Sequence, residues 1–317
     1  MNKPTLLLHI GLTKTGTTTL QLSLFDKHPQ VYYLGKSSGG PMDIKLCSSD
    51  LSYSILNPIL WKLKKPLDTK AVLSLYQEKL LPMVSEEQIL VASFEGLGNR
   101  TNDVHKEMLS RIKTIFGQCR LMITLRNPIT RLPSQYLQNL RENFISQNHH
   151  WMGSKSYADI ETWYRGRMRR RRDPLMDYSA CIQSSVEQLG RENVGVFLFE
   201  ELHQDSNAYY QSICEFVGID SEIGVSLAKN EHFHSRLTEA QVAHMREINS
   251  SFLKRTHNSF SDNRSRIKAL KENANSPPAK AVLPEELKKK VSDATRVGHR
   301  WLVDNLDLPL EKYGYPL

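Results

Sequence analysis

The sequence predicts an α/β fold in which a parallel sheet is covered by helices on both faces. Short apolar runs of strand length alternate with longer segments that carry apolar residues at helical spacing. The short runs are apolar almost throughout, which is typical of strands buried on both faces of a parallel sheet. With 317 residues, the chain is long enough for one large domain or two small ones, at roughly 150 residues per domain.

Five apolar segments are expected to form the strands. The first contains only Leu, His and Ile, and the others are equally short. The expected strands span residues 6–10, 31–34, 89–93, 121–125 and 194–199.

Helices are expected between these strands, because apolar residues recur there every three or four positions. Leu73, Tyr76 and Leu80 show this spacing, and Pro82 is expected to end their helix. Pro128 is expected to open another helix, since proline is favoured at the first helical position. Leu73, Tyr76 and Leu80 lie in the helix expected at 68–81. The other helices are expected at residues 17–27, 102–116, 178–189 and 206–217.

The C-terminal part of the sequence is helical only. From about residue 238 no strand is expected, and Pro284 opens a final amphipathic helix. We therefore expect one domain over residues 1–317, with a nucleotide-binding α/β core at 1–220 and a helical extension at 221–317. Two polar segments rich in Ser, Gly or Pro, 35–66 and 258–281, are expected to be loops or lids.

Charge and cysteine content indicate which partners, metals and cellular locations to expect. The 42 Lys and Arg residues against 34 Asp and Glu give a net charge of +8, which favours anionic partners. The four cysteines are far apart and no His cluster has ligand spacing, so neither a metal site nor a disulfide framework is expected. No signal peptide or membrane span is expected either. The predicted location is cytoplasmic, although a luminal catalytic domain without its anchor would show the same pattern.

A glycine-bearing turn between the first strand and the first helix is the strongest chemical signal. Residues 11–19 read GLTKTGTTT. Such a turn directs backbone N–H groups and the positive end of a helix at one point, where a phosphate binds. It resembles a P-loop, but Thr17 stands where the Walker A pattern has its lysine, and Lys14 lies before the second glycine. The strand at 121–125 also lacks the terminal Asp that holds Mg²⁺, so a P-loop kinase is the weaker alternative.

A second anion site is indicated by Arg126 and Ser134. Arg126 ends a strand, and Ser134 follows eight residues later, about two turns into the next helix. A guanidinium fork and a hydroxyl are both suited to phosphate oxygens. A ligand with two phosphates is therefore expected.

Together these segments resemble the sulfotransferases that use PAPS (3′-phosphoadenosine 5′-phosphosulfate). The loop at residues 14–18 is similar to their 5′-phosphosulfate loop, and Arg126 with Ser134 is similar to their 3′-phosphate motif. The resemblance continues at 194–202 and 214–219, and it covers roughly residues 5–220. The R-K-G-x-x-G motif of the cytosolic phenol and steroid enzymes is missing near the C-terminus, which favours a bacterial, carbohydrate-type enzyme.

The resemblance implies metal-independent, in-line transfer of a sulfuryl group from PAPS to an acceptor hydroxyl or amine. The product nucleotide is adenosine 3′,5′-bisphosphate (PAP). Lys14 is expected to stabilise the charge that develops on the leaving phosphate and on the sulfuryl oxygens. The expected ligands of the 5′-phosphate are Thr15, Gly16, Thr17 and Thr18.

Glu95 is the candidate general base. It follows the strand at 89–93, and ligands of open parallel sheets bind at the carboxyl edge of the strands. In position it matches the Glu or His that other family members carry after this strand. An exposed or capping carboxylate is the alternative interpretation. The competing bases are His149, His150, His232 and His234.

An arginine run between residues 165 and 172 is the densest charge in the chain, and Trp163 and Tyr164 adjoin it. It is interpreted either as a binding site for an acidic acceptor or as a solvated face. The expected acceptor is a carbohydrate or glycolipid. A non-catalytic polyanion binder is a further alternative, but no nucleic-acid motif supports it. His9 is expected to be a histidine of the core or one that supports the site residues from behind, and Glu200 is expected to hold the end of its strand.

Overall fold

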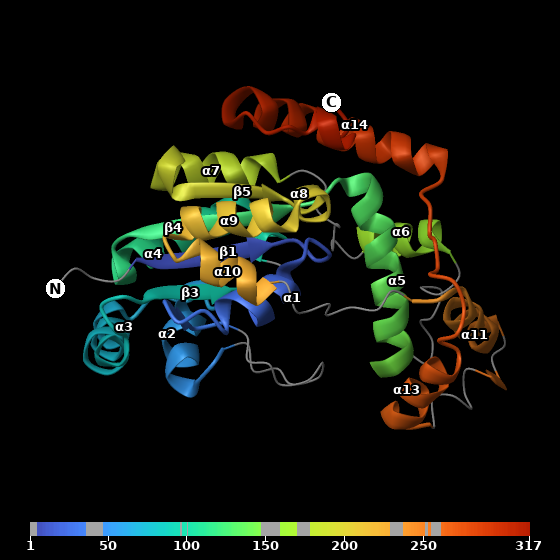
Figure 1. Ribbon diagram of the computed structural model, residues 1–317, viewed down its shortest axis with the longest axis horizontal. Coiled ribbons are helices and arrows are strands. Elements are labelled where there is room, and N and C mark those ends of the chain that lie inside the picture. Colours follow the sequence, from blue (N-terminus) through green and yellow to red (C-terminus); the bar gives the residue numbers. More distant parts are fainter. Residues whose placement is uncertain are drawn as a thin grey trace. The chain divides into compact units, whose positions relative to one another are not determined.

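The computed structural model describes residues 5–35, 47–95, 97–99, 101–146, 159–169, 178–228, 237–250, 253–254 and 261–317. The chain divides into two compact units. Figure 1 shows the chain coloured along its sequence. The first unit combines Met1–Arg126 with Asp177–Phe233, and the second combines Asn127–Met176 with His234–Leu317. The expected division of one domain at about residue 220 stays a prediction.

In the described part of the first unit, five parallel strands form one sheet with the order β2-β3-β1-β4-β5. Each apolar segment expected to be a strand is one, so the predicted α/β class is confirmed. The strands are β1 (Leu6–Gly11), β2 (Val31–Tyr33), β3 (Ile89–Ser93), β4 (Cys119–Leu125) and β5 (Val194–Leu198).

Helices of the first unit connect or follow these strands. They are α1 (Thr17–Thr19), α2 (Asp50–Leu60), α3 (Thr69–Ser74), α4 (Asn102–Phe116), α7 (Ser179–Leu189), α8 (Phe199–Gln204), α9 (Ser206–Val217) and α10 (Ser221–Ala228). Two π-helical segments continue α1 and α3, namely η1 (Leu20–Phe25) and η2 (Leu75–Leu80). The helix expected at 17–27 therefore exists, but most of it is π-helical, and the N–H of Asp26 bonds to the carbonyl of Gln21.

Both faces of the sheet are covered because the chain leaves β1 toward one edge and β4 toward the other. Right-handed crossovers then place the helices after β1 on one face, and α4 and α7, which precede β4 and β5, on the other. On one face Leu7, Val91 and Met122 pack with Leu24 of η1 and Ile213 of α9. Figure 1 shows α9 and α10 in front of the sheet. Helices α4 and α7 contact each other and β4.

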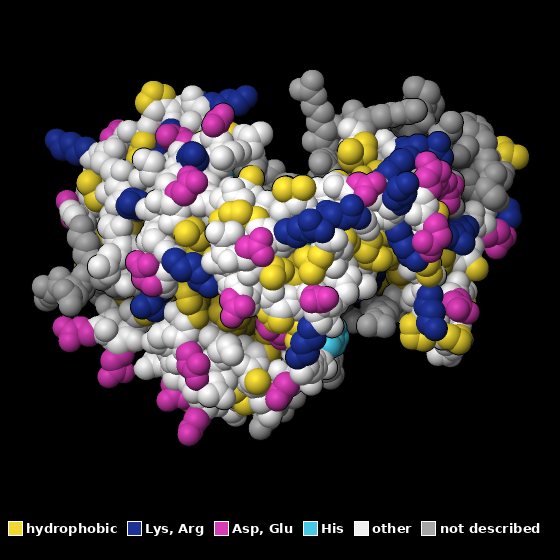
Figure 2. Space-filling view, turned by 90° about the horizontal axis from the view of Figure 1, so that it is seen from above, with side chains coloured by type: hydrophobic (Ala, Val, Ile, Leu, Met, Phe, Trp, Pro, Cys, Tyr) yellow, Lys and Arg dark blue, Asp and Glu magenta, His cyan; other side chains and the backbone are white. Residues whose placement is uncertain are grey.

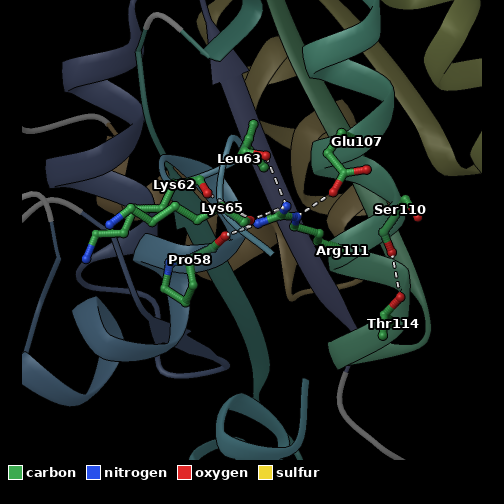
Figure 3. Close-up of polar contacts among 8 residues, drawn as sticks. All are labelled: Pro58, Lys62, Leu63, Lys65, Glu107, Ser110, Arg111 and Thr114. Atoms are coloured by element: carbon green, nitrogen blue, oxygen red, sulfur yellow. Dashed lines mark hydrogen bonds and ion pairs between the residues drawn. The ribbon is translucent and has the colours of Figure 1, made fainter. Parts of the chain in front are cut away.

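The segment expected to be a loop at 35–66 contains helix α2, so that expectation was wrong for residues 50–60. Ser49 caps the start of this helix by accepting from the N–H of Ser52. Its end is held by Arg111 of α4, whose buried guanidinium donates to the carbonyls of Pro58, Leu63 and Lys65 at 2.8–3.1 Å (Figure 3). It also pairs with Glu107 at 2.6 Å. These bonds satisfy carbonyls at and beyond the end of α2, which local sequence leaves without partners.

The described part of the second unit is built of helices. They are α5 (Pro128–Ser146), α6 (Ile160–Arg169), α11 (Glu239–Ser250), α13 (Asn263–Glu272) and α14 (Glu285–Leu306). One core joins α5, α6 and α14, and another joins α5, α11 and α13. Helix α13 lies inside the segment expected to be a loop at 258–281, because the Asp262 carboxylate caps it by accepting from the N–H of Ser265. Among the described helices none is long and apolar enough to cross a membrane.

Candidate active site

The loop after β1 and the end of β4 are neighbours at the carboxyl edge of the sheet. Gly11, the last residue of β1, is paired with Thr124 of β4. From these two adjacent strands the chain departs in opposite directions, toward β2 and toward β5. Such a topological switch point opens a crevice at the carboxyl ends of the strands, where open α/β sheets bind their ligands.

The loop itself needs two unusual backbone conformations. Lys14 and Gly16 have positive φ angles of 71° and 81°. A side chain on Gly16 would also meet the ring of Phe199, because a Cβ atom there would lie 3.2 Å from the ring. A Cβ atom on Gly11 would come within 2.2 Å of the Thr17 methyl group. Both glycines are therefore required for the loop to fold back onto the end of β1.

Arg126 fastens this loop to the end of β4. Its Nη1 donates to the carbonyl of Lys14 at 3.2 Å, and its guanidinium carbon lies 4.7 Å from the centre of the Phe199 ring. The hydroxyl of Tyr178 donates to the Arg126 carbonyl at 3.1 Å. The guanidinium is thus held beside the loop by an aromatic face and a backbone carbonyl.

Glu95 reaches the same loop from the end of β3. Its carboxylate is exposed and accepts a hydrogen bond from the hydroxyl of buried Thr17. This contact brings the candidate general base next to the candidate phosphate loop. A hydroxyl has only one proton to donate, so Thr17 binds phosphate as a donor only after it releases Glu95. Its role toward phosphate stays a prediction.

The remaining predicted site residues lie elsewhere or outside the described residues. Ser134 is half-buried on α5 in the second unit, and its pairing with Arg126 stays a prediction. Thr15 is fully buried and Thr18 is half-buried. Two further groups of predicted residues lie outside the described residues. The first is the set of competing bases, His149, His150, His232 and His234, and the second is Arg170, Arg171 and Arg172.

The described part of the arginine run belongs to helix α6. Arg165 lies 4.0 Å from Glu161, and Arg167 donates to Asn139 at 3.1 Å while it lies over Trp163. Trp163 and Tyr164 are buried in the core of the second unit. They therefore offer no aromatic surface to an acceptor, which corrects one reason for interpreting the run as a binding site.

Helix α14 carries a mixed set of charges. Lys288 pairs with Glu285 at 2.5 Å, and Lys290 pairs with Glu286 at 2.9 Å. Figure 2 shows basic and acidic side chains close together. Such pairs reduce the net positive field that a polyanion-binding surface needs.

Three features of the site were not predicted. No local pattern indicates that Phe199 covers both Gly16 and Arg126, because these contacts join distant segments. Glu201 accepts a hydrogen bond from the N–H of Leu198, the last residue of β5, and the role expected of Glu200 stays a prediction. His9, Ser93 and Thr124 form a buried polar cluster beneath the loop.

Comparison with known proteins gives a family match over most of the chain. A family model described as "Sulfotransferase domain" matches residues 4–297. No similar protein was found among curated proteins.

Solved structures of low identity also match. A sulfotransferase from Alicyclobacillus acidocaldarius is 16% identical, with 85% of this chain and 96% of that chain covered and a TM-score of 0.44. A sulfotransferase from Mycobacterium avium is 13% identical, with 74% and 70% covered and a TM-score of 0.40. A mouse sulfotransferase complexed with PAP is 15% identical, with 70% and 64% covered and a TM-score of 0.37.

Proposed function

Because the chain belongs to the sulfotransferase domain family, we propose that it transfers a sulfuryl group from PAPS to an acceptor hydroxyl or amine and releases PAP. Family membership confirms the predicted class of enzyme, a sulfotransferase. The observation that carries the proposal is the arrangement of Lys14, Gly16 and Arg126 around one loop at the switch point of the sheet.

The loop is proposed to bind the 5′-phosphosulfate of the donor. Its positive φ angles at Lys14 and Gly16 turn successive backbone groups toward one side, as in other anion-binding turns. Backbone N–H groups of residues 15–18 then hold the phosphate, and the Lys14 ammonium stabilises the charge that grows on the leaving oxygen. Arg126 is proposed as one ligand of the 3′-phosphate. Ser134 is proposed as the other, on the sequence motif alone.

Glu95 is proposed to accept the proton of the acceptor. In an in-line transfer the acceptor oxygen forms a bond to sulfur while the bond from sulfur to the 5′-phosphate oxygen breaks. The proton of the acceptor hydroxyl passes to a carboxylate positioned within hydrogen-bond reach. The contact of Glu95 with Thr17 supports this role, because it holds the carboxylate beside the loop.

The proposed acceptor is a carbohydrate or glycolipid, and the proposed location is the cytoplasm. The net charge of +8 favours an acceptor that carries acidic groups. Cys47, Cys119, Cys181 and Cys214 are free and buried, which suits a reducing compartment. A screen of candidate acceptors with labelled PAPS tests the acceptor class. Transfer to phenols or steroids and to no saccharide would contradict it.

Ligand-induced thermal stabilisation tests the donor. A ligand at 100 times its dissociation constant stabilises the folded state by about 2.7 kcal/mol, which is a measurable shift in melting temperature. We expect this shift with PAP in the presence of EDTA and little shift with ATP and Mg²⁺. The opposite ranking would end the assignment and favour a P-loop kinase.

Replacement of Lys14 tests the catalytic role of the loop. Lys14→Met keeps an unbranched side chain that is one atom shorter and removes its charge, so transfer is expected to slow by about 10²-fold or more. Lys70→Met, at an exposed position of α3, is the matched control and is expected to leave the rate unchanged. Equal rates in both variants would remove Lys14 from the mechanism.

A further inference from the structure

Five polar side chains are buried together directly beneath the loop. His9 lies on β1, Ser93 on β3 and Thr124 on β4, while Thr15 belongs to the loop and Gln21 to η1. Their exposed fractions are 0% for four of them and 4% for Gln21. Polar groups so deeply buried are costly unless they are hydrogen-bonded.

The five side chains form one continuous chain of hydrogen bonds. Gln21 Nε2 lies 3.0 Å from Ser93 Oγ, which lies 2.7 Å from His9 Nδ1. On the other side of the ring, His9 Nε2 lies 3.2 Å from Thr124 Oγ1. Thr124 Oγ1 lies 2.8 Å from Thr15 Oγ1, and Thr15 Oγ1 lies 2.7 Å from the carbonyl oxygen of Leu12.

The carbonyl of Leu12 fixes the direction of every bond in one half of this chain. A carbonyl only accepts, so the single hydroxyl proton of Thr15 points to Leu12. Thr15 Oγ1 must then accept from the hydroxyl of Thr124. Because Thr124 has used its own proton, it accepts from His9, and Nε2 of His9 must carry hydrogen.

The other half of the chain leads independently to the same tautomer. Gln21 Nε2 also lies 3.2 Å from the carbonyl oxygen of Ser93, which identifies this atom as the amide nitrogen and a donor. Its second hydrogen is donated to Ser93 Oγ. The hydroxyl proton of Ser93 is thereby left for His9 Nδ1, which accepts it and carries no hydrogen.

We propose that His9 is a positioning residue that, as the neutral Nε2–H tautomer, ties the loop after β1 to strands β3 and β4. The chain of bonds ends on Thr15 and Leu12, on either side of Lys14 in the sequence. It therefore fixes the backbone that must hold the positive φ of Lys14. The inference rests on the proposed function only in taking the donor nucleotide as the ligand of the loop. The tautomer of His9 and the ordering of the loop are properties of the protein without nucleotide.

Burial supports the neutral form. Desolvation lowers the pKa of His9 to about 3, so the ring carries no charge near neutral pH. The Phe25 ring lies edge-on at 5.7 Å and helps to exclude water. The buried hydroxyl of Tyr33 faces Ser93 but lacks the geometry of a hydrogen bond, and it leaves the direction of the chain unchanged.

The tautomer is tested by two-bond ¹H–¹⁵N correlation spectra of the full protein, selectively labelled with [¹⁵N]histidine, at pH 7 and without nucleotide. The signal of His9 is assigned as the one that Thr124→Val perturbs most. We expect a protonated Nε2 and an unprotonated Nδ1. The Nδ1–H tautomer, or an imidazolium ion, would overturn the inference.

The positioning role is tested by two substitutions at Thr124. Thr124→Val keeps the shape of the side chain and removes the hydroxyl, whereas Thr124→Ser keeps the hydroxyl. In Thr124→Val the amides of residues 12–17 are expected to exchange about tenfold faster or more, the factor that one lost buried hydrogen bond produces. Thr124→Ser is expected to restore slow exchange to within about threefold of the wild type.

The PAP affinity of the same variants separates this inference from the proposed function. If PAP binds, its dissociation constant is expected to rise about tenfold in Thr124→Val and to recover in Thr124→Ser. If the wild-type protein ignores PAP but the loop shows this exchange pattern, the positioning role stands and the proposed donor falls. Unchanged exchange in Thr124→Val overturns the positioning role. Should that variant not fold, Thr15→Val compared with Thr15→Ser applies the same test from the loop side.

Discussion

The hydroxyl of Thr17 donates a hydrogen bond to the carboxylate of Glu95, and this contact joins the loop after β1 to the end of β3. Thr17 is buried whereas Glu95 is exposed. The carboxylate is therefore anchored on one side and open to solvent on the other. This is the situation that a general base requires, because it must keep its position and still reach a proton on an incoming acceptor.

Glu95→Gln is expected to abolish most of the sulfuryl transfer while PAP binding is kept. The amide oxygen still accepts from Thr17, so the position of the side chain is preserved, but an amide does not take up the proton. We expect kcat to fall at least about 10²-fold and the dissociation constant of PAP, measured by calorimetry, to stay within about threefold of the wild-type value. Glu222→Gln, at an exposed position of α10, is the control. Full turnover by Glu95→Gln would assign the base to another residue.

Arg126→Lys is expected to weaken PAP binding about tenfold although the positive charge is kept. A lysine has no planar fork with which to stack on Phe199 and reach the Lys14 carbonyl at the same time. Calorimetric titration with PAP measures the effect. The matched control is Arg296→Lys, at a half-exposed position that pairs with Asp293 at 3.6 Å. Equal affinity in the Arg126→Lys variant and the wild type would show that the fork is dispensable.

Gly16→Ala and Gly166→Ala are expected to change the melting temperature in opposite directions. Gly16 has a φ of 81° and a neighbouring aromatic ring, so a methyl group there is strained by roughly 1–2 kcal/mol. Gly166 lies within α6 with nothing within 4 Å of an added Cβ atom. Alanine there is expected to stabilise the helix by roughly 0.5–1 kcal/mol. Calorimetric melting measures both, and a stabilised Gly16→Ala variant would contradict the described loop.

Arg111→Met is expected to destabilise the first unit by about 3 kcal/mol, because it leaves the carbonyls of Pro58, Leu63 and Lys65 without their donor (Figure 3). The loss is measured by urea unfolding. Arg296→Met removes a solvent-accessible ion pair and is expected to cost less than about 0.5 kcal/mol. Similar losses in the two variants would mean that Arg111 does not hold the end of α2.

The strands and the position of the loop were predictable because they depend on local sequence. A short run of apolar residues predicts a strand buried on both faces. The glycine-bearing turn after it is recognised from residues that are adjacent in the sequence. Helix α2 was not predictable, because its last carbonyls are satisfied by Arg111 from a distant helix.

The chemistry around the loop depends on still longer separations. His9 was expected either in the core or as a support for the site, but the sequence did not identify its partners, because Ser93 and Thr124 are 84 and 115 positions away. Trp163 and Tyr164 adjoin the arginine run in the sequence and were therefore expected to help bind an acceptor. In the structure both rings are buried in a core. Contacts of this kind are set by the packing of the sheet and of the second unit, which no local pattern records.

The pH dependence of stability provides a last prediction, because His9 is neutral when folded. Its pKa is about 3 in the folded state and 6.5 as the ordinary value. Between these values the unfolded chain binds more protons, so the free energy of unfolding falls as the pH falls from 6.5 toward 3. His9 alone accounts for a slope of up to about 1.4 kcal/mol per pH unit.

His9→Gln removes this slope, because glutamine does not titrate, while the acidic residues act equally in both proteins. Urea unfolding of the wild type and of His9→Gln at pH 7, 6, 5 and 4 is therefore expected to give two curves that converge as the pH falls. The variant starts less stable, because the hydrogen bonds to Ser93 and Thr124 are disturbed, and it loses less on acidification. Parallel curves would mean that His9 takes up its proton at the same pH in the folded and the unfolded protein. The buried, one-directional chain beneath the loop would then be wrong as well.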